Sequence, residues 1–448
     1  MSAVSNIFQS FIDLGASIML PIIIFIFALA LKIKPGKALL SGLTVGIGFI
    51  GLNLVIGLLT STVGPSAQAM VSNFGLQLET IDIGWPAASA IAYGTILGVM
   101  AIPVGILVNV VLLFIGLTRT MNIDLWNFWH LAFSGSIVYM ITQDFALGIF
   151  TMITHSLLLY IVSDLAAKDI EETYQMPNMT FPQGASVAGY ITAKPLAILF
   201  NHIPALERIQ IDSDKVQEKL GVFGNNTVIG LIIGLGIGAL AGYDIKGILE
   251  VGVNTAAVMM LMPRMVSLLM EGLTPISEHA SQMVQDRFPD RDVYIGMDSA
   301  LAVGQSSVLA TSLLLVPVTL VLAMILPGNR VLPLGDLATL PFMLALMTAV
   351  FKGDMFKSLL GGVVHVIASL YIATWAAPYI TESAQASGFD LKGASSISVL
   401  SDGGAWSTII FGGMGKLLSW WGIGIVFVIL LAGLYYINKF RVNKVSER

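Results

Sequence analysis

Long apolar runs separated by short polar segments dominate this chain. A helix that crosses a membrane needs about 20 mainly apolar residues, and we predict eleven such crossings. The run 130–163 is too long for one helix, and we split it into two crossings at the polar residues Thr142, Gln143 and Asp144. The predicted crossings cover residues 14–32, 39–60, 88–117, 130–163 (two), 226–243, 246–264, 299–326, 332–351, 357–377 and 420–437.

Composition agrees with this pattern. Hydrophobic residues make up 56% of the 448 residues, charged residues only 11%, and the mean hydropathy is +0.86. Such a chain is stable mainly in lipid, so the sequence predicts an all-α polytopic membrane protein. The net charge is −5, and no basic patch is large enough to bind nucleic acid.

The distribution of Lys and Arg predicts the orientation. With the N-terminus outside, all but four of the 22 basic residues fall on the inner side; the four are Lys246, Arg330, Lys392 and Lys416. Lys and Arg are retained on the cytoplasmic side of a membrane, so we expect a cytoplasmic C-terminus with a basic tail at 438–448. Residues 1–31 contain no Lys or Arg, so the positive region of a cleavable signal peptide is lacking.

The order of the crossings predicts an internal repeat. Crossings one to five start outside and crossings six to ten start inside, which is the plan of inverted-repeat transporters with a substrate site near the midplane. The stretches 181–203 and 272–298 are short, half-apolar and rich in Gly and Pro, and we expect them to form two re-entrant hairpins.

Ionisable and polar residues within the predicted crossings are candidates for function, because they are costly in lipid. Asp298, in Gly-Met-Asp-Ser-Ala, is the first: its carboxylate accepts hydrogen bonds only and suits the vicinal hydroxyls of a sugar or polyol. Asp298 is equally suited to cap the crossing that follows, and both roles are compatible.

Three further candidates lie near predicted helix starts or turns. His130 opens one crossing, and Ser134 lies one turn later on the same face; the alternative for His130 is an interfacial position beside Trp126 and Trp129. Gln183, in Phe-Pro-Gln-Gly, would lie at the tip of the first hairpin. Its amide can read a neutral hydroxyl, or it can satisfy its own turn.

Two weaker candidates complete the set. Trp85, in Gly-Trp-Pro, can stack on the C–H face of a carbohydrate or anchor the helix at the interface. Asn53 is a lone amide within a crossing, where hydrogen bonding between helices is the ordinary role. His155 and His365 are expected to be structural. No spacing of His and carboxylates suggests a metal site, and no cofactor motif is present.

Three classes of function are compatible with these features so far. They are a permease subunit, an ion-coupled secondary transporter of polyols or sugars, and a membrane-embedded enzyme. The chain has no Cys, so it cannot carry a thiolate nucleophile or a phosphocysteine. It also lacks a Ser–His–Asp arrangement, so we do not expect an enzyme in its own right.

Several motifs resemble one family. They are Gly-Ile-Gly-Phe-Ile-Gly-Leu (46–52), Asp-Ile-Gly-Trp-Pro (82–86), Ala-Gly-Tyr-Asp-Ile-Lys-Gly (241–247), Glu-Gly-Leu-Thr-Pro-Ile (271–276) and Pro-Gly-Asn-Arg-Val-Leu-Pro-Leu-Gly-Asp-Leu-Ala-Thr (327–339). Together, over residues 10–440, they resemble the galactitol-type IIC permease of the phosphoenolpyruvate-dependent sugar phosphotransferase system, in the ascorbate–galactitol superfamily.

The resemblance implies a single IIC membrane domain over 1–448, with interleaved core and scaffold parts, a homodimer and an elevator-like motion. It implies that a polyol such as galactitol is carried inward and phosphorylated by a separate IIB protein, which is served by IIA. The superfamily's substrate contacts align with Trp85, His130, Ser134, Gln183 and Asp298, of which His130 and Asp298 keep the residue type. Galactitol permeases often have His where this chain has Gln183.

Overall fold

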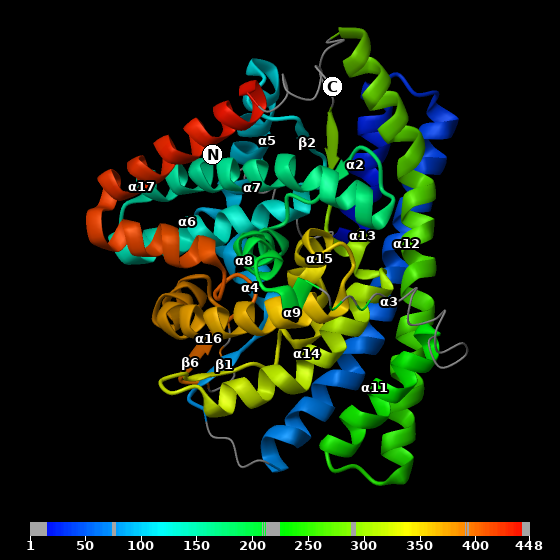
Figure 1. Ribbon diagram of the computed structural model, residues 1–448. Coiled ribbons are helices and arrows are strands. Elements are labelled where there is room, and N and C mark those ends of the chain that lie inside the picture. The colour runs from blue at the N-terminus through cyan, green and yellow to red at the C-terminus, as the bar shows by residue number, and fades with distance from the viewer. Residues whose placement is uncertain are drawn as a thin grey trace.

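The computed structural model of the protein describes residues 16–73, 78–207, 209, 211, 225–287, 293–389, 391 and 394–440. Over these residues the chain is mainly helical, with six strands of two or three residues each. In Figure 1 one group of long helices runs roughly vertically on the right, and a second group lies roughly horizontally on the left.

The first half of the chain begins with two helices and then alternates strands and helices. Its elements are α2 (Ala16–Ala30), α3 (Pro35–Asn73), β1 (Thr80–Asp82), α4 (Gly84–Gly94), α5 (Gly98–Ile115), β2 (Thr120–Asn122), the 3₁₀ turn η1 (Leu125–Phe128), α6 (Trp129–Thr142), α7 (Phe145–Tyr174), β3 (Met179–Thr180) and α8 (Gly184–Asn201). The short α9 (Pro204–Glu207) follows.

The second half repeats this order element by element. It consists of α11 (Asn226–Leu240), α12 (Ile245–Arg287), β4 (Tyr294–Gly296), α13 (Ala300–Val303), α14 (Ser306–Ile325), β5 (Val331–Leu332), the 3₁₀ turn η3 (Leu337–Thr339), α15 (Leu340–Val350), α16 (Met355–Ala386), β6 (Ser396–Ser398) and α17 (Trp406–Phe440). The halves therefore share one order of elements, as an internal repeat requires.

The strands interlock the two halves. One parallel sheet has the order β5-β1-β6, so a first-half strand lies between two second-half strands, with Thr80 opposite Val331 and Ser396. The other parallel sheet has the order β2-β4-β3, which is the same arrangement with the halves exchanged. Backbone amides cannot be left unpaired inside a membrane, and these short ladders pair the non-helical segments.

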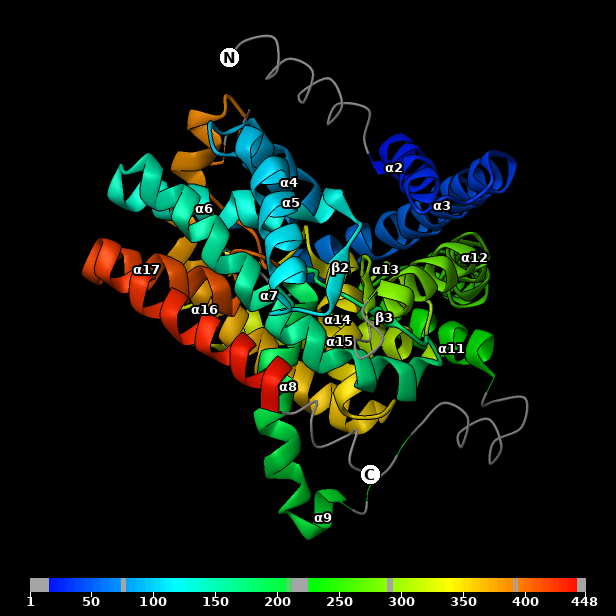
Figure 2. The same ribbon diagram turned by 90° about the horizontal axis from the view of Figure 1, so that it is seen from above.

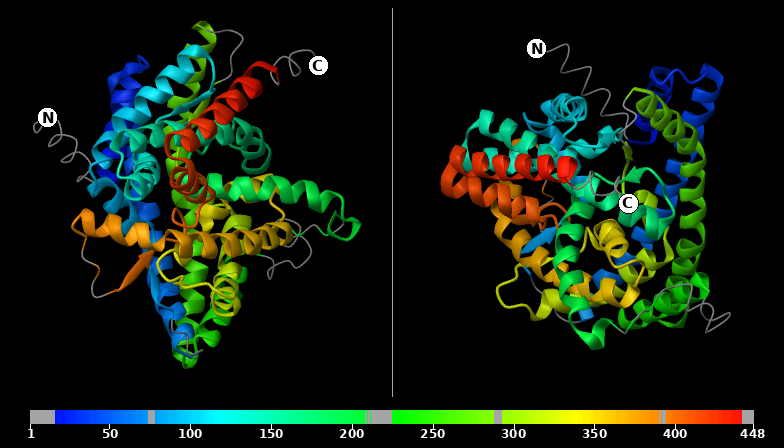
Figure 3. Two further views of the ribbon diagram at one scale, coloured as in Figure 1. Left: turned by 90° about the vertical axis from the view of Figure 1, so that its left-hand side faces the viewer. Right: turned by 45° about the horizontal axis from the view of Figure 1, so that its top comes forward.

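Four helices form a layer of their own. Helices α2, α3, α11 and α12 pack together along one side, and α4 to α8, α16 and α17 lie on the other side of the molecule (Figure 2). Contact between α3 and α12 is close at glycines: a Cβ on Gly272 would lie 2.9 Å from the Val45 amide nitrogen. The right-hand view of Figure 3 shows α12 running along this side, away from α17.

Helices α3 and α12 are longer than the sequence predicted. The apolar pattern ended crossings at residues 60 and 264, but α3 continues to Asn73 and α12 to Arg287. At 1.5 Å per residue, 39 and 43 residues give about 58 and 64 Å, far more than the hydrocarbon core of a bilayer. A helix satisfies its own backbone hydrogen bonds, so it can continue beyond the apolar residues of a crossing.

The expectation of a hairpin at 272–298 is wrong, because residues up to Arg287 continue α12 and β4 follows. The stretch 181–203 contains one helix, α8, preceded by β3, so it is a strand and a helix rather than two helical arms. Its counterpart in the second half is β6 with the first part of α17. Helix α17 breaks at Ser419 (φ 49°, ψ −126°), and its second part turns back (Figure 1).

Four helices of the described chain are long and apolar enough to cross a membrane; they are Phe145–Tyr174, Ser306–Ile325, Met355–Ala386 and Trp406–Lys439. Shorter apolar helices cover Met100–Ile115, Gly230–Leu240 and Leu340–Val350. Helices α6 and α15, with 14 and 11 residues, are about 21 and 17 Å long. Neither can span a hydrocarbon core of about 30 Å alone.

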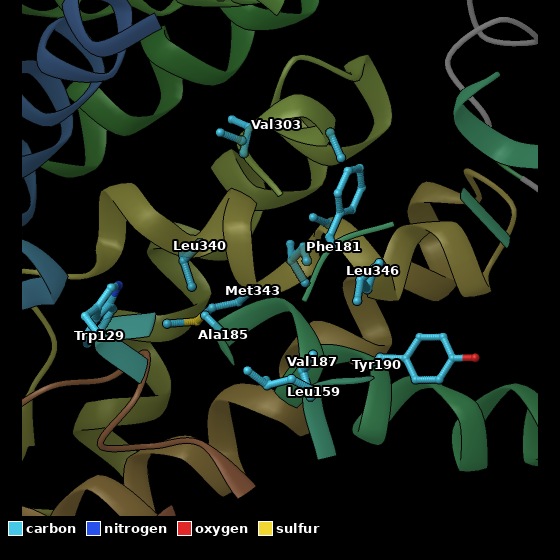
Figure 4. Close-up of a cluster of buried hydrophobic side chains, with 14 of the residues drawn as sticks. Trp129, Leu159, Phe181, Ala185, Val187, Tyr190, Val303, Leu340, Met343 and Leu346 are labelled. Carbon is cyan, nitrogen blue, oxygen red and sulfur yellow. The ribbon is translucent and has the colours of Figure 1, made fainter. Parts of the chain in front are cut away.

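The packing between α8 and α15 fixes the start of α8. Figure 4 shows Ala185 of α8 beside Leu340 and Met343 of α15, and Val187 beside Leu159 of α7. A side chain at Gly189 would collide with the Met343 carbonyl group, so the two backbones approach closely. The turn before α8 is therefore held rigidly against the core.

Candidate functional site

Two buried polar clusters lie at the strand ends. The first, which we call the closed cluster, consists of Asp82 and Asp336. The two oxygens of Asp82 accept from the amides of Gly84 (3.1 Å), Leu400 (3.1 Å) and Asp336 (2.8 Å). Because the donors come from both halves, this carboxylate ties β1 to the segments after β5 and β6.

Asp336 is satisfied in the same way. One oxygen accepts from the Trp85 amide (2.8 Å) and the Thr339 hydroxyl (3.0 Å), and the other accepts from the Ser401 amide (2.7 Å). Each of the four carboxylate oxygens in the closed cluster thus has a protein donor. Trp85 contributes its backbone here, and its half-buried side chain packs against the hydrophobic core.

The second cluster, which we call the open cluster, is centred on His130 at the start of α6. His130 Nδ1 lies 2.5 Å from Asp402 Oδ1, and both side chains are buried. Asp402 belongs to the segment between β6 and α17, so this pair also joins the two halves. The sequence reasoning missed Asp402, because residues 378–419 read as a long external segment.

Two neighbours hold the imidazole ring of His130 in place. The ring of Trp129 lies against it, with the centroids 4.1 Å apart. On α8, a Cβ at Gly184 would come within 2.7 Å of His130 Nδ1, so only glycine fits there. The first residue of α8 therefore approaches the ring through its backbone.

Asp298 belongs to the open cluster. It follows β4, is half-buried, and lies within electrostatic range of His130 and beside Asn127. Its Oδ1 accepts from the Ala300 amide at 2.7 Å. Asp298 thus satisfies the first amide of the four-residue helix α13, whose N-cap residue is Ser299.

Ser134 and Gln183 are engaged within the protein. The Ser134 hydroxyl lies 2.8 Å from Nδ1 of His155, on α7. Gln183 is the N-cap of α8, where its Oε1 accepts from the Ser186 amide at 2.7 Å. These hydrogen bonds engage the Ser134 hydroxyl and the Gln183 carbonyl oxygen within the protein. The two residues therefore stabilise the surroundings of the open cluster.

Asn53 is the one candidate that lies outside the strand-end clusters. It belongs to α3, in the four-helix layer, and its side chain is outside the described part of the structure. No group of three or more His, Cys, Asp or Glu that could hold a metal ion occurs among the described residues.

The open cluster contains buried polar atoms without a partner among the described residues. A buried polar group without a partner costs about 1–3 kcal/mol, so such atoms mark a place where a ligand can complete the hydrogen bonding. They are His130 Nε2, Asp402 Oδ2, Asn127 Nδ2 and His155 Nε2. Acceptors and donors close together suit a ligand with several hydroxyl groups.

The surroundings of Asp164 differ from those that the sequence predicted. The predicted crossing ended at residue 163, which would leave Asp164 at a helix end, but α7 continues to Tyr174 and Asp164 is enclosed. It accepts from the hydroxyls of Thr118 (3.0 Å) and Thr120 (2.7 Å) and from the Asn438 amide (3.1 Å). Asp164 thus joins α7 to β2 and to the end of α17.

Comparison with known proteins identifies the class. The family model for the sugar-specific permease component of the phosphotransferase system (EIIC-GAT) matches residues 10–393. The chain belongs to this family. It is a transport subunit of a phosphotransferase complex and an integral membrane protein.

Individual relatives support the same family assignment. Over 401 residues the chain is 39% identical to the galactitol-specific EIIC component of Escherichia coli strain K12, covering 90% of this chain and 89% of the relative. The O157:H7 protein of the same name gives the same values. A permease IIC component of strain K12 is 37% identical over 430 residues, which cover 95% of this chain and 96% of that protein.

Proposed function

We propose that this permease binds galactitol or a similar polyol at the open cluster and carries it inward for phosphorylation by a separate IIB protein, which is recharged by IIA. The observation that carries the proposal is the group of unpartnered buried polar atoms around His130 and Asp402. A relative that is 39% identical and named for galactitol supports the choice of substrate. An ion-coupled transporter is not favoured by these relatives.

Within this proposal the N-terminus is external and the C-terminus cytoplasmic. Contacts between helix ends support the threading, because they join segments predicted to lie on the same side. The Asn438 amide donates to the Leu117 carbonyl on the predicted inner side. On the predicted outer side, the Trp420 indole donates to Asp144 at 2.7 Å.

The strand-plus-helix segments are the re-entrant elements of this proposal. Strand β3 would enter from the inner side and α8 would return there, where Lys194 pairs with Asp169 at 2.8 Å. Strand β6 and the first part of α17 would do the same from the outer side. The four-helix layer would be the scaffold of a homodimer embedded in membrane lipid, and the remaining helices would move as an elevator core.

Orientation is tested with reporters fused to the C-terminus. We expect a cytoplasmic reporter to be active and a periplasmic one to be silent. The reverse result would refute the charge-based orientation.

Coupling is tested by uptake of labelled galactitol in a host without other hexitol transport. Uptake should require phosphoenolpyruvate, IIA and IIB, and galactitol phosphate should accumulate inside. The chain has no Cys, so it cannot carry a phosphocysteine itself. Accumulation of unmodified polyol driven by a proton or sodium gradient, with IIB deleted, would instead support the ion-coupled alternative.

A further inference from the structure

The His130 imidazole is held in one orientation by Asp402. The 2.5 Å between His130 Nδ1 and Asp402 Oδ1 places the two atoms within hydrogen-bond distance. When the Asp402 carboxylate is ionised it only accepts hydrogen bonds, and Nδ1 is then the donor of this pair. In the neutral ring, Nε2 is then the acceptor.

Nε2 has no partner among the described residues, although it is buried. Trp129 lies against the ring, and the Gly184 backbone lies close to Nδ1. The ring therefore cannot turn without disturbing its neighbours, and its one unused nitrogen is an acceptor. This is the arrangement by which an Asp–His pair prepares a base for a hydroxyl group.

We propose that His130, positioned by Asp402, is the general base that accepts the proton of the polyol hydroxyl during its phosphorylation. This inference rests on the proposed function. The hydroxyl oxygen forms a bond to the phosphorus of the phosphothiol on IIB, the S–P bond breaks, and the thiolate leaves. The hydroxyl proton passes to His130 Nε2, and the imidazolium returns it to water after the phosphorylated product leaves.

Other groups around His130 have different tasks. One oxygen of Asp298 accepts a hydrogen bond from the Ala300 amide. Its second oxygen is suited to hold a polyol hydroxyl rather than to orient the His130 ring. His155, which faces the cluster from α7, is engaged with Ser134. Asp402 is thus the carboxylate hydrogen-bonded to His130 in the described structure, and we regard it as a positioning residue.

Asp402→Asn separates binding from phosphorylation. The measurements are galactitol affinity by calorimetry and the IIB-dependent phosphorylation rate at saturating galactitol. General bases contribute about 10²–10⁴-fold, so we expect the rate at saturating galactitol to fall by about 100-fold or more, and by a larger factor than the affinity, to which Asp402 Oδ2 also contributes. The control, Asp144→Asn, changes the carboxylate that caps α7 and should leave both values unchanged.

A rate for Asp402→Asn within threefold of the wild-type rate would overturn the proposal, as would a loss confined to affinity. His130→Gln supplies a second test. If Asp402 acts through His130, the double variant Asp402→Asn/His130→Gln should be no slower than His130→Gln alone. Additive losses would contradict this.

A third measurement does not depend on transport. Nitrogen NMR of ¹⁵N-histidine-labelled protein, with His130→Gln used to assign the signal, should show a protonated Nδ1 and a bare Nε2, with the bare signal shifting in Asp402→Asn. A protonated Nε2 in the neutral wild-type ring would overturn the proposal. Wild-type protein that binds no polyol or passes on no phosphate would refute the proposed function, while the NMR result would still decide the role of Asp402.

Discussion

The closed and open clusters are built from similar parts and differ in one respect. Both place buried carboxylates at strand ends, and both join the two halves of the chain. In the closed cluster, every oxygen of Asp82 and Asp336 accepts from the protein. In the open cluster, Asp402 Oδ2 and His130 Nε2 have no partner among the described residues.

The difference indicates what each cluster is for. A carboxylate with all its donors inside the protein stabilises the junction of the halves, whereas unpartnered atoms are costly unless a ligand completes them. The clusters are neighbours in the chain, since the Ser401 amide donates to Asp336 and the next residue, Asp402, pairs with His130. The rigid junction therefore positions one carboxylate of the open cluster.

The residues that begin α6 are not repeated at the start of its counterpart, α15. Helix α6 begins with Trp129 and His130, whereas its counterpart α15 begins with Leu340, which is fully buried in the hydrophobic core. One architecture thus begins one helix with residues of the open cluster and its counterpart with an apolar residue that follows Thr339, a hydrogen-bond donor to Asp336 of the closed cluster.

The largest expected effect is the loss of stability in Asp336→Leu. It leaves the amides of Trp85 and Ser401 without an acceptor, which should lower stability by about 2–6 kcal/mol at roughly 1–3 kcal/mol per group. Asp402→Asn keeps an oxygen for His130 Nδ1 and should cost less than about 1 kcal/mol. Unfolding of both variants in the same detergent measures this contrast, and equal losses would show that the clusters do not differ in role.

Asp298→Asn sharpens the role of the open cluster. It should weaken galactitol binding by about 10- to 150-fold, because the loss of one charge-assisted hydrogen bond costs about 1.5–3 kcal/mol. Asn still caps a helix nearly as well as Asp, so an affinity within twofold of wild type would mean that Asp298 is only a cap. Calorimetry on folded protein gives the answer.

The control for Asp298→Asn is Asp144→Asn. The Leu147 amide and then the Trp420 indole hold the pKa of the Asp144 carboxyl below its usual range, so it is ionised at neutral pH. Asp144 lies in the turn between α6 and α7, away from the strand ends. Asp164 is unsuitable as a control, because it has several structural partners.

Trp85→Leu should have the smallest effect. The Trp85 amide keeps its bond to Asp336, so stability should stay close to that of the wild type. If the indole ring stacks on the polyol, affinity should fall by about 2- to 12-fold, from roughly 0.5–1.5 kcal/mol. Trp421→Leu is the matched control, since Trp421 is 82% exposed. Unchanged polyol affinity in Trp85→Leu would assign Trp85 to packing alone.

The sequence singled out His130 and Asp298 as candidates, because each is a polar residue within or beside an apolar run. It missed Asp402, whose surroundings in the sequence are rich in Gly and Ser and resemble an external loop. It misplaced Asp164 because hydropathy located the end of α7 about ten residues too early. In both cases the deciding partners, His130 and Asn438, are more than 270 residues away.

The sequence by itself determined that the chain belongs in a membrane and which motifs place it in its family, because hydropathy and local residue types are readable along the chain. Only the tertiary structure decided which polar residues are satisfied and which are not. The strands that gather those residues are two or three residues long, too short to leave a periodic signal. They form because backbone groups from distant segments must pair where water is scarce.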